Sequence, residues 1–256
     1  MGVHPLATRA FGGAPEDYER GRPGWPVDAV AALLDRFGVG PGDTVLDLAA
    51  GTGKLTRALA ELTDGVVAIE PLDAMRHVLQ SRLPAVRALP GTAEQIPLAD
   101  GSVAAAFVAE AFHWFDLPRA IAELARVLRR GGGLALMWNT SGDAGVDWFD
   151  ELHAIVDEHR VETAMPPGRE RVPWRAALEA DSRFAPLHDE EATNQQGTDR
   201  DGLVAMIGSF SFIGGLPDDR RAAALAACRA VLERHDVDAV TLTYKTLITT
   251  TRRIDG

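Results

Sequence analysis

The feature that most constrains this chain is a buried strand that passes through a glycine turn directly into a helix. It lies in the segment VLDLAAGTGKLT at residues 45–56, where Gly51 and Gly53 follow an apolar run. A strand, a tight glycine turn and a helix in immediate succession are typical of nucleotide-binding α/β sheets. The segment therefore predicts a cofactor site at the carboxyl end of a parallel strand.

Two common nucleotide-binding loops do not match this segment. A phosphate loop of the GxxxxGK[ST] type requires glycine where Leu48 stands and Ser or Thr where Leu55 stands. The dinucleotide fingerprint GxGxxG requires a third glycine where Thr56 stands. The first loop fails at two positions and the second at one, so neither phosphate-bearing ligand is the favoured one.

Two acidic residues accompany the glycine turn. Asp47 lies on the strand before it, and Glu70 ends the next predicted strand, GVVAIE at 65–70. One strand-helix-strand unit separates them, so Glu70 is expected beside the turn across the sheet. A carboxylate there can accept hydrogen bonds from the two hydroxyls of a ribose, and the helix start offers free N–H groups to a carboxylate. This chemistry suits an adenosine that carries an amino acid.

The first 140 residues alternate between short apolar runs and helical patterns. Strands are expected at 44–49, 65–70, 85–89, 103–110 and 134–138, with helices at 27–37, 54–63, from 71 onward, and 116–130. The strands are apolar throughout, as burial on both faces by crossover helices requires. The pattern predicts an α/β fold with a doubly wound, Rossmann-like, mostly parallel sheet.

The rhythm changes after about residue 139. Helical segments are expected at 147–160, 173–181, 199–210 and 217–234, with a poorly patterned strand near 184–193. A last strand at 240–250 alternates with period 2, which favours an edge or antiparallel strand. We expect one domain over 1–256, composed of an N-terminal cap segment (1–37), a cofactor-binding core (40–140), mainly helical insertions on the substrate side (141–235) and the last strand (238–251).

Charge and composition narrow the partners. The chain holds 26 Lys and Arg against 37 Asp and Glu, a net charge of −11, and 46% of its residues are hydrophobic. Because neutralising phosphates supplies most of the affinity for nucleic acids, a nucleic-acid partner is not expected. No apolar run approaches the ~20 residues of a membrane span, and the N-terminus lacks the apolar core of a signal peptide. With Cys228 as the single cysteine, a cytoplasmic protein is expected.

The glycine segment resembles the first motif of the class I S-adenosylmethionine-dependent methyltransferases. Their DxGxGxG core is matched from Asp47 to Gly53, with Ala49 in place of the first glycine, and their ribose-binding acid is matched by Glu70. The resemblance continues into GTAEQIPLADGS at 91–102 and covers roughly residues 40–138. It implies a seven-stranded methyltransferase sheet with an antiparallel last strand, S-adenosylmethionine as the cofactor and S-adenosylhomocysteine as its product.

The resemblance also implies which residues contact the cofactor. The glycine segment and the second strand supply one group, and the segments after the third and fourth strands supply the other. The expected cofactor-binding residues are Asp47, Ala49, Gly51, Gly53, Glu70, Pro71, Met75, Ala93, Glu94, Glu110 and Trp114.

Two shorter stretches are similar to the small-molecule branch of that family, which includes trans-aconitate methyltransferases. They are YERGRPGWP at 18–26 and AEAFHWFD at 109–116. By this resemblance the first stretch folds over the cofactor, with Tyr18 or Arg22 near its carboxylate. The alternative for this stretch is a proline-rich entry to the helix at 27–37.

Methyl transfer is an in-line displacement, so the protein mainly aligns the reactants and excludes water. A base is useful for hydroxyl, amine or acidic carbon acceptors. His113 is the leading base candidate, with Glu110 beside it, because both follow the fourth strand at the carboxyl edge of the sheet. The alternatives are that His113 packs against its aromatic neighbours and that Glu110 stays solvated.

The acceptor pocket is expected to come from the C-terminal half. Seven residues are lining candidates, some of which will instead belong to the core: Trp138, Asn139, Trp148, Trp174, Phe210, Phe212 and Tyr244. The segment GSFSFIGGLP at 208–217 is either a lid or an ordinary connection between helices. The histidines share no metal-ligand spacing with carboxylates, so no metal is expected.

Three functions are compatible with these patterns. The first is methylation of a small organic acceptor at oxygen, nitrogen or carbon. The second is a nicotinamide-dependent oxidoreductase on a similar sheet, against which the missing third glycine counts. The third is a non-catalytic protein that binds S-adenosylmethionine. The sequence specifies neither the acceptor atom nor the oligomeric state.

Overall fold

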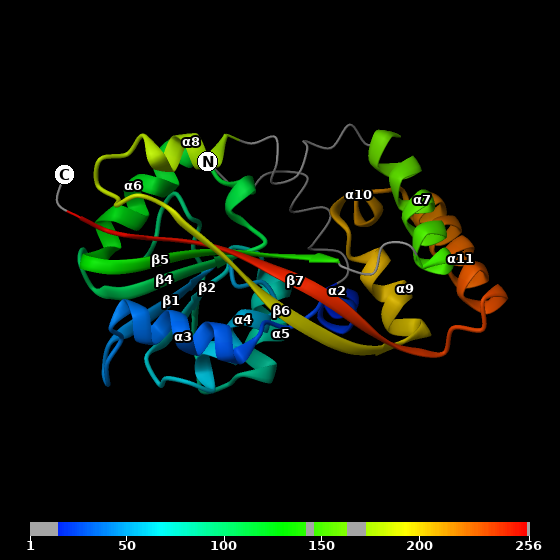
Figure 1. Ribbon diagram of the computed structural model, residues 1–256, viewed down its shortest axis with the longest axis horizontal. Coiled ribbons are helices and arrows are strands. Elements are labelled where there is room, and N and C mark those ends of the chain that lie inside the picture. Colours follow the sequence, from blue (N-terminus) through cyan, green and yellow to red (C-terminus); the bar gives the residue numbers. More distant parts are fainter. Residues whose placement is uncertain (1–14, 142–145, 163–172, 255–256) are drawn as a thin grey trace.

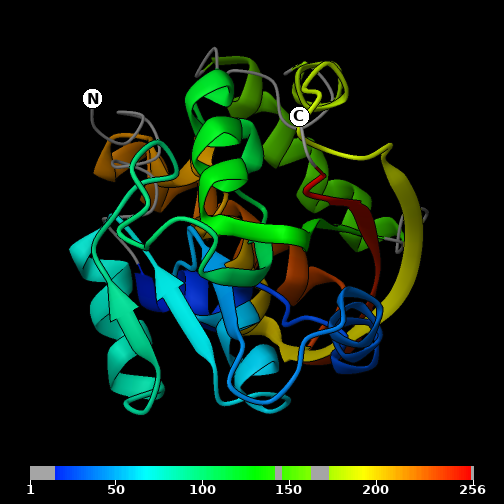
Figure 2. The same ribbon diagram turned by 90° about the vertical axis from the view of Figure 1, so that its left-hand side faces the viewer.

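The computed structural model describes residues 15–141, 146–162 and 173–254. Its strands are β1 (Thr44–Leu48), β2 (Val66–Ile69), β3 (Arg87–Leu89), β4 (Val103–Ala109), β5 (Leu128–Ser141), β6 (His188–Asp199) and β7 (Ala239–Arg252). They form one seven-stranded sheet in the order β3-β2-β1-β4-β5-β7-β6. Figure 2 shows this order, from β3 at the left to β6 at the right.

The helices are α2 (Pro15–Gly21), α3 (Val27–Phe37), α4 (Lys54–Ala60), α5 (Asp73–Arg82), η1 (Phe112–Trp114, a 3-10 turn), α6 (Leu117–Val127), α7 (Asp147–Glu162), α8 (Trp174–Glu179), α9 (Arg200–Gly208), α10 (Ser211–Gly214) and α11 (Asp218–Arg234). In Figure 1, α3 and α4 lie on one side of the sheet and α6 and α8 on the other. The predicted doubly wound α/β sheet is therefore confirmed.

Alternation along the inner strands explains why apolar residues occupy neighbouring positions on them. On β1, Val45 packs into the apolar cluster with α3 and α4, whereas Leu46 packs into the cluster with α6 and α8. On β4, Phe107 and Val108 divide between the same two clusters. Both faces of each strand are buried, as a parallel sheet with crossover helices requires.

The last strand is antiparallel, as expected, and it lies inside the sheet. β7 pairs antiparallel with β5 on one side, from Gly133↔Arg252 to Ser141↔Tyr244, and antiparallel with β6 on the other. The outer position belongs to β6, whose residues alternate between exposed and half-buried. The strand expected near 184–193 is observed from His188 to Asp199, and its polar composition is that of an edge strand with one face in water.

Two predicted boundaries are wrong. The helix expected to extend to residue 130 ends at Val127, and β5 begins at once with Leu128, which pairs with Val103. The register then shifts, so that Ala105 pairs with Gly133. The helix expected over 54–63 ends at Ala60. The segment 129–133, expected as a helix end and a glycine turn, belongs instead to β5.

The C-terminal helices form a separate apolar cluster beyond one end of the sheet. α7, α9 and α11 pack around Leu152, Leu203 and Leu232, which are fully buried. β6 and β7 extend from the sheet to this helical group, and α2 lies between the group and the sheet (Figure 1).

Candidate functional site

The glycine turn joins β1 to α4 through three residues with positive φ. Ala49, Gly51 and Gly53 have φ values of 60°, 59° and 89°. Of the residues described, none comes within 4 Å of the position that a Cβ on Gly51 would take, so the crest of the turn faces open space. A Cβ on Gly53 would lie 2.8 Å from Leu79 Cγ, so α5 packs closely under the start of α4. The turn therefore presents bare backbone on its open side.

Glu70 lies beside this turn, as its spacing from Asp47 predicts. Its Oε2 accepts a hydrogen bond from the Gly51 N–H at 2.9 Å, and its Oε1 accepts one from the Leu72 N–H at 2.8 Å. Burial raises the pKa of Glu70 to about 7, and these two N–H groups oppose the shift. The carboxylate is thus held by backbone on two sides and keeps lone pairs for further donors.

Asp47 lies beneath the turn and is almost completely buried. Its Oδ2 accepts a hydrogen bond from Thr56 Oγ1 at 2.6 Å. Burial raises the pKa of Asp47 to about 7, with a smaller contribution from the charge of Glu70. The hydrogen bond from Thr56 links β1 to the first turns of α4 and so supports the glycine turn from below.

The segments after β2 and β3 complete this side of the site. Pro71 is half-buried, Met75 is buried on α5, and Ala93 is buried in the cluster that also contains Ile69 at the end of β2. Glu94 Oε1 accepts a hydrogen bond from the Asp116 N–H at 3.0 Å. Segment 91–96 is therefore packed against the strand that carries Glu70.

The N-terminal helix α2 closes over the glycine turn. Glu19 is buried and accepts hydrogen bonds from Thr52 Oγ1 at 2.7 Å and from Arg57 Nη2 at 2.8 Å, and Lys54 Nζ lies 3.9 Å away. Burial opposes ionisation of Glu19, but the hydrogen bonds from Thr52 and Arg57 outweigh it and lower its pKa. Sequence reasoning missed this residue, because nothing in PEDYERG distinguishes a buried glutamate from the solvated ones.

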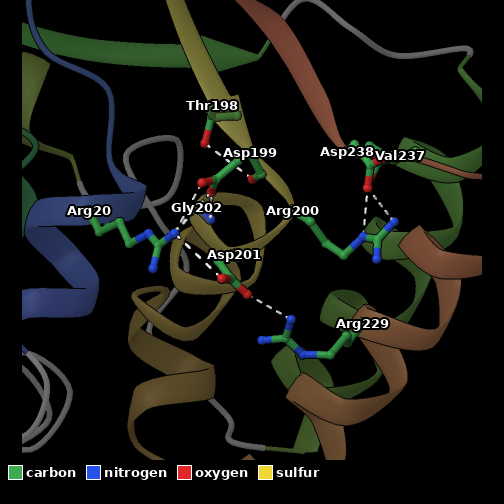
Figure 3. Close-up of polar contacts among 9 residues, drawn as sticks. All are labelled: Arg20, Thr198, Asp199, Arg200, Asp201, Gly202, Arg229, Val237 and Asp238. Carbon is green, nitrogen blue, oxygen red and sulfur yellow. Dashed lines mark hydrogen bonds and ion pairs between the residues drawn. The ribbon is translucent and has the colours of Figure 1, made fainter.

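The opposite side of α2 is bound to the junction of β6 and α9 (Figure 3). Arg20 Nη2 lies 3.2 Å from both carboxylate oxygens of Asp199, which also caps α9 by accepting from the Gly202 N–H at 2.6 Å. Asp201 lies 3.6 Å from Arg20 and also pairs with Arg229 of α11. These exposed pairs each contribute little energy. Together they fix which faces of α2 meet the glycine turn and the helical group.

A cavity of about 150 Å³ lies between the strand ends, α2 and the helical group. Its lining combines polar side chains with apolar walls: Tyr18, Arg22, Pro23, Trp25, Lys54, Glu110, Asn139, Ser141, Phe149, His153, Met206, Phe210 and Tyr244. Lys54 opens α4 directly after the glycine turn, so the cavity adjoins that turn. Burial lowers the pKa of Lys54, and the nearby Glu19 carboxylate opposes this shift.

Three predicted cofactor or catalytic residues line this cavity. Glu110 has a φ of 54°, and its Oε1 accepts a hydrogen bond from the Asn139 N–H at 2.8 Å, which ties the ends of β4 and β5 together. Arg22 donates from Nε to Ser209 Oγ at 2.8 Å and lies 4.5 Å from the centroid of the Phe210 ring. Burial raises the pKa of Tyr18 to about 12, so its phenol is protonated at neutral pH.

His113 occupies a different environment. It lies on η1, its ring is 5.3 Å from that of the half-buried Trp114, and its Nδ1 accepts a long hydrogen bond of 3.5 Å from Trp138 Nε1. Because an indole N–H only donates, the neutral ring carries its proton on Nε2. Burial lowers the pKa of His113 to about 4. His113 is not among the described residues that line the cavity.

The acceptor-side candidates divide into two groups. Asn139, Phe210 and Tyr244 line the cavity, whereas the rings of Trp138 and Trp174 pack against each other inside the core, with their centroids 5.1 Å apart. The segment 208–217 connects α9 to α11, and α10 forms within it. Trp148 and Phe212 pack against the apolar cluster of the C-terminal helices.

Comparisons with known proteins now identify the family. Residues 46–136 match the family model described as a methyltransferase domain. An uncharacterized methyltransferase of Mycobacterium tuberculosis (strain H37Rv) is 41% identical over 228 residues, which are 88% of this chain and 86% of that protein. The chain belongs to the class I S-adenosylmethionine-dependent methyltransferases.

Two solved structures have the same fold as this methyltransferase. A candidate type II methyltransferase from Anaeromyxobacter dehalogenans aligns with a TM-score of 0.60 and 25% identity over 92% of this chain and 99% of that one. A phosphoethanolamine N-methyltransferase of Haemonchus contortus, solved with phosphomonomethylethanolamine and S-adenosylhomocysteine, aligns with a TM-score of 0.59 and 15% identity over 98% of this chain and 59% of that one. The oxidoreductase and non-catalytic alternatives are set aside by the family.

Within residues 15–141, 146–162 and 173–254 of this methyltransferase, no group of three or more His, Cys, Asp or Glu side chains is placed to hold a metal ion. In the same part of the chain, every helix is too short or too polar to cross a bilayer.

Proposed function

We propose that this methyltransferase binds S-adenosylmethionine at the glycine turn and Glu70, and transfers its methyl group to a small molecule held in the adjoining cavity. The observation that carries the proposal is the contiguity of the two sites. Lys54 at the start of α4 and Glu110 at the end of β4 both line the cavity, and both follow strands whose ends border the glycine turn.

The residues at the turn fit the chemistry of an adenosine bearing an amino acid. Glu70 is almost completely buried and keeps lone pairs that can accept from two ribose hydroxyls. The open side of Gly51 admits close approach of a ligand to the backbone. Ala93 and Glu94 are proposed to contact the adenine, and Tyr18 and Arg22 the amino-acid end. Trp114, Pro71 and Met75 complete the proposed cofactor site.

When bound, S-adenosylmethionine supplies an electrophilic methyl group on a positively charged sulfur. The chain's own contribution is to align the acceptor with that methyl group and to exclude water. The walls of the cavity come from α2, the strand ends, α7 and α9. Glu110 and His113 stay as the candidates for proton transfer that follow β4.

A small-molecule acceptor is proposed on two grounds. The cavity is small, about 150 Å³, and the net charge of −11 disfavours nucleic acid. The expected compartment is the cytoplasm.

The test combines ligand binding with transfer. Thermal unfolding is measured with S-adenosylhomocysteine, with NAD and without ligand, and a ligand at about 100 times its Kd should add ~2.7 kcal/mol of stability. We expect stabilisation by S-adenosylhomocysteine alone. Radiolabelled methyl transfer to a panel of small phenols, carboxylates and amines then tests the acceptor class. Stabilisation by NAD instead would contradict the proposed cofactor site.

A further inference from the structure

His153 lines the cavity but belongs to none of the sequence motifs described above. It lies on α7, in the helical group, and lines the cavity together with Glu110 and Lys54 from the opposite, strand-end side. The cavity therefore places an imidazole across from the groups that border the proposed cofactor site.

The hydrogen bond of His153 determines which ring nitrogen is basic. Its Nδ1 lies 2.9 Å from the carbonyl oxygen of Phe149, one helical turn earlier. A carbonyl oxygen only accepts, so Nδ1 carries the proton and the lone pair of the neutral ring is on Nε2. The Phe149 ring, 4.2 Å from the imidazole between centroids, also restricts its orientation. The carbonyl and the ring of Phe149 thus hold the imidazole of His153 in place, with Nδ1 engaged.

His113 has the opposite arrangement. The lone pair on its Nδ1 is directed at the Trp138 indole, and its proton is on Nε2. Burial in addition disfavours its protonated form. Of the two histidines, His153 is the one that lines the cavity.

The residues that line the cavity indicate what kind of acceptor fits it. Phe149, Phe210, Trp25 and Met206 contribute apolar surface to the cavity. Aromatic walls favour a ring through offset or edge contacts. The space thus suits a single hydroxylated aromatic ring.

We propose that His153 is the general base of this enzyme and that its methyl acceptor is a small phenol. This inference rests on the proposed function. The acceptor oxygen forms a bond to the methyl carbon as the carbon–sulfur bond breaks, and that bonding pair stays on sulfur. The hydroxyl proton moves to Nε2 of His153, and the imidazolium then releases it to solvent.

Other titratable and charged groups line the same cavity and set the field at His153. They are Tyr18, Arg22, Lys54, Glu110 and Tyr244. Tyr18 stays protonated at neutral pH because burial raises its pKa, so it does not compete as a base. Glu110 is engaged with the Asn139 N–H.

The first experiment needs no turnover. Nitrogen-15 NMR of histidine-labelled protein reports the tautomer of each neutral ring, with assignment by His153→Asn and His113→Asn variants. We expect His153 to be protonated at Nδ1 and His113 at Nε2. A His153 ring protonated at Nε2 would remove the available lone pair and overturn the proposal.

The second experiment compares acceptors of one shape that differ in nucleophile: p-cresol, 4-methylbenzoate and p-toluidine. His153→Asn keeps a donor for the Phe149 carbonyl but has no basic nitrogen. We expect it to lower kcat/KM for p-cresol by about 100-fold or more and to remove the rise of activity with pH. His159→Asn, on the same helix but outside the cavity lining, is the matched control and should behave as wild type.

Binding of S-adenosylhomocysteine separates the two levels of the proposal. Loss of that binding in the wild-type protein would contradict the proposed function itself. With binding intact, transfer only to 4-methylbenzoate or p-toluidine, transfer to none of the three, or p-cresol methylation undiminished in His153→Asn would each overturn the assignment of His153 and of a phenol acceptor.

Discussion

Glu19 and Thr52 join two parts of the chain that sequence alone does not connect: the α2 carboxylate accepts a 2.7 Å hydrogen bond from the hydroxyl between the two glycines of the turn. Thr52 is completely buried, and Glu19 is 7% exposed. The helix that carries Tyr18 and the backbone of the glycine turn are therefore one mechanical unit.

The first prediction tests this unit. Glu19→Gln keeps the shape of the side chain but removes the charge that pairs with Arg57, so we expect a loss of about 2 kcal/mol of unfolding free energy and weaker binding of S-adenosylhomocysteine. Urea unfolding and calorimetric titration measure both. Glu16→Gln changes an exposed glutamate of the same helix and serves as the control. Wild-type affinity and stability in Glu19→Gln would show that the contact has no such role.

The second prediction concerns Glu70. Replacing it by Ala removes the acceptor proposed for two ribose hydroxyls, and we expect the binding of S-adenosylhomocysteine to weaken by ~2 kcal/mol or more. The same change frees the N–H groups of Gly51 and Leu72. Glu61→Ala, at an exposed glutamate just after α4, is the control in the same calorimetric titration. Unchanged affinity of Glu70→Ala for S-adenosylhomocysteine would mean that Glu70 does not bind the ribose.

The third prediction is a pH dependence of the ligand-free protein. Burial raises the pKa of Asp47 from 3.8 to about 7, so between these values the folded chain retains a proton that the unfolded chain has lost. Stability is therefore present at low pH and falls as the pH rises toward 7. Asp47→Asn lacks this titration and can still accept from Thr56. Its stability relative to wild type should rise by up to about 1.4 kcal/mol per pH unit across that range.

Urea unfolding at a series of pH values measures this difference. Asp35→Asn, which removes an exposed carboxylate on α3, should follow the wild-type curve. Parallel curves for Asp47→Asn and wild type would mean that Asp47 is ionised in the folded protein throughout.

The fourth prediction concerns Ala49, which stands where the family's motif has its first glycine. Its φ of 60° is the left-handed conformation, which costs an L-residue roughly 1–2 kcal/mol. Part of the gain from glycine is offset by its larger unfolded-state entropy, so we expect Ala49→Gly to stabilise the fold by about 0.5–1 kcal/mol. Ala50→Gly, at a neighbour without positive φ, should destabilise it. Equal effects in urea unfolding would argue against strain at Ala49.

The fifth prediction concerns the contact of α2 with α9. A Cβ on Gly21 would lie 2.1 Å from the backbone nitrogen of Met206, so the helices touch backbone to backbone. Gly21→Ala must displace α2, and we expect a cost of about 1–3 kcal/mol together with weaker binding of S-adenosylhomocysteine. Gly24→Ala is the matched control, because among the residues described nothing lies within 4 Å of its added Cβ. Similar thermal unfolding of the two variants would contradict this packing.

Sequence patterns predict the parts of this fold whose order follows the chain. Continuous apolar runs mark β1 and β4, and the helix expected over 27–37 is observed as α3, ended by Gly38 with a φ of 70°. Glu70 is found beside the glycine turn because the length of one strand-helix-strand unit sets its place. Such features depend on local periodicity and spacing.

The features that sequence patterns miss depend on contacts between distant segments. β6 has an exposed and polar pattern, and its pairing with β7 comes from the sheet edge that β7 leaves open. Glu19 is buried only because α2 closes over Thr52. His153 lines the cavity together with Glu110 and Lys54, which are distant in the sequence, and its contact with Phe149 four residues earlier is on its own an ordinary helical pair.

The two sides of the cavity come from separate parts of the architecture. The glycine turn and Glu70 belong to the sheet, whereas α7 and α9 stand on the far end of the long β6–β7 pair. Substitutions along α7 and α9 can therefore change the shape of the acceptor cavity without changing the residues proposed to bind the cofactor. Proteins with this fold can therefore differ in their methyl acceptor through changes in these two helices alone.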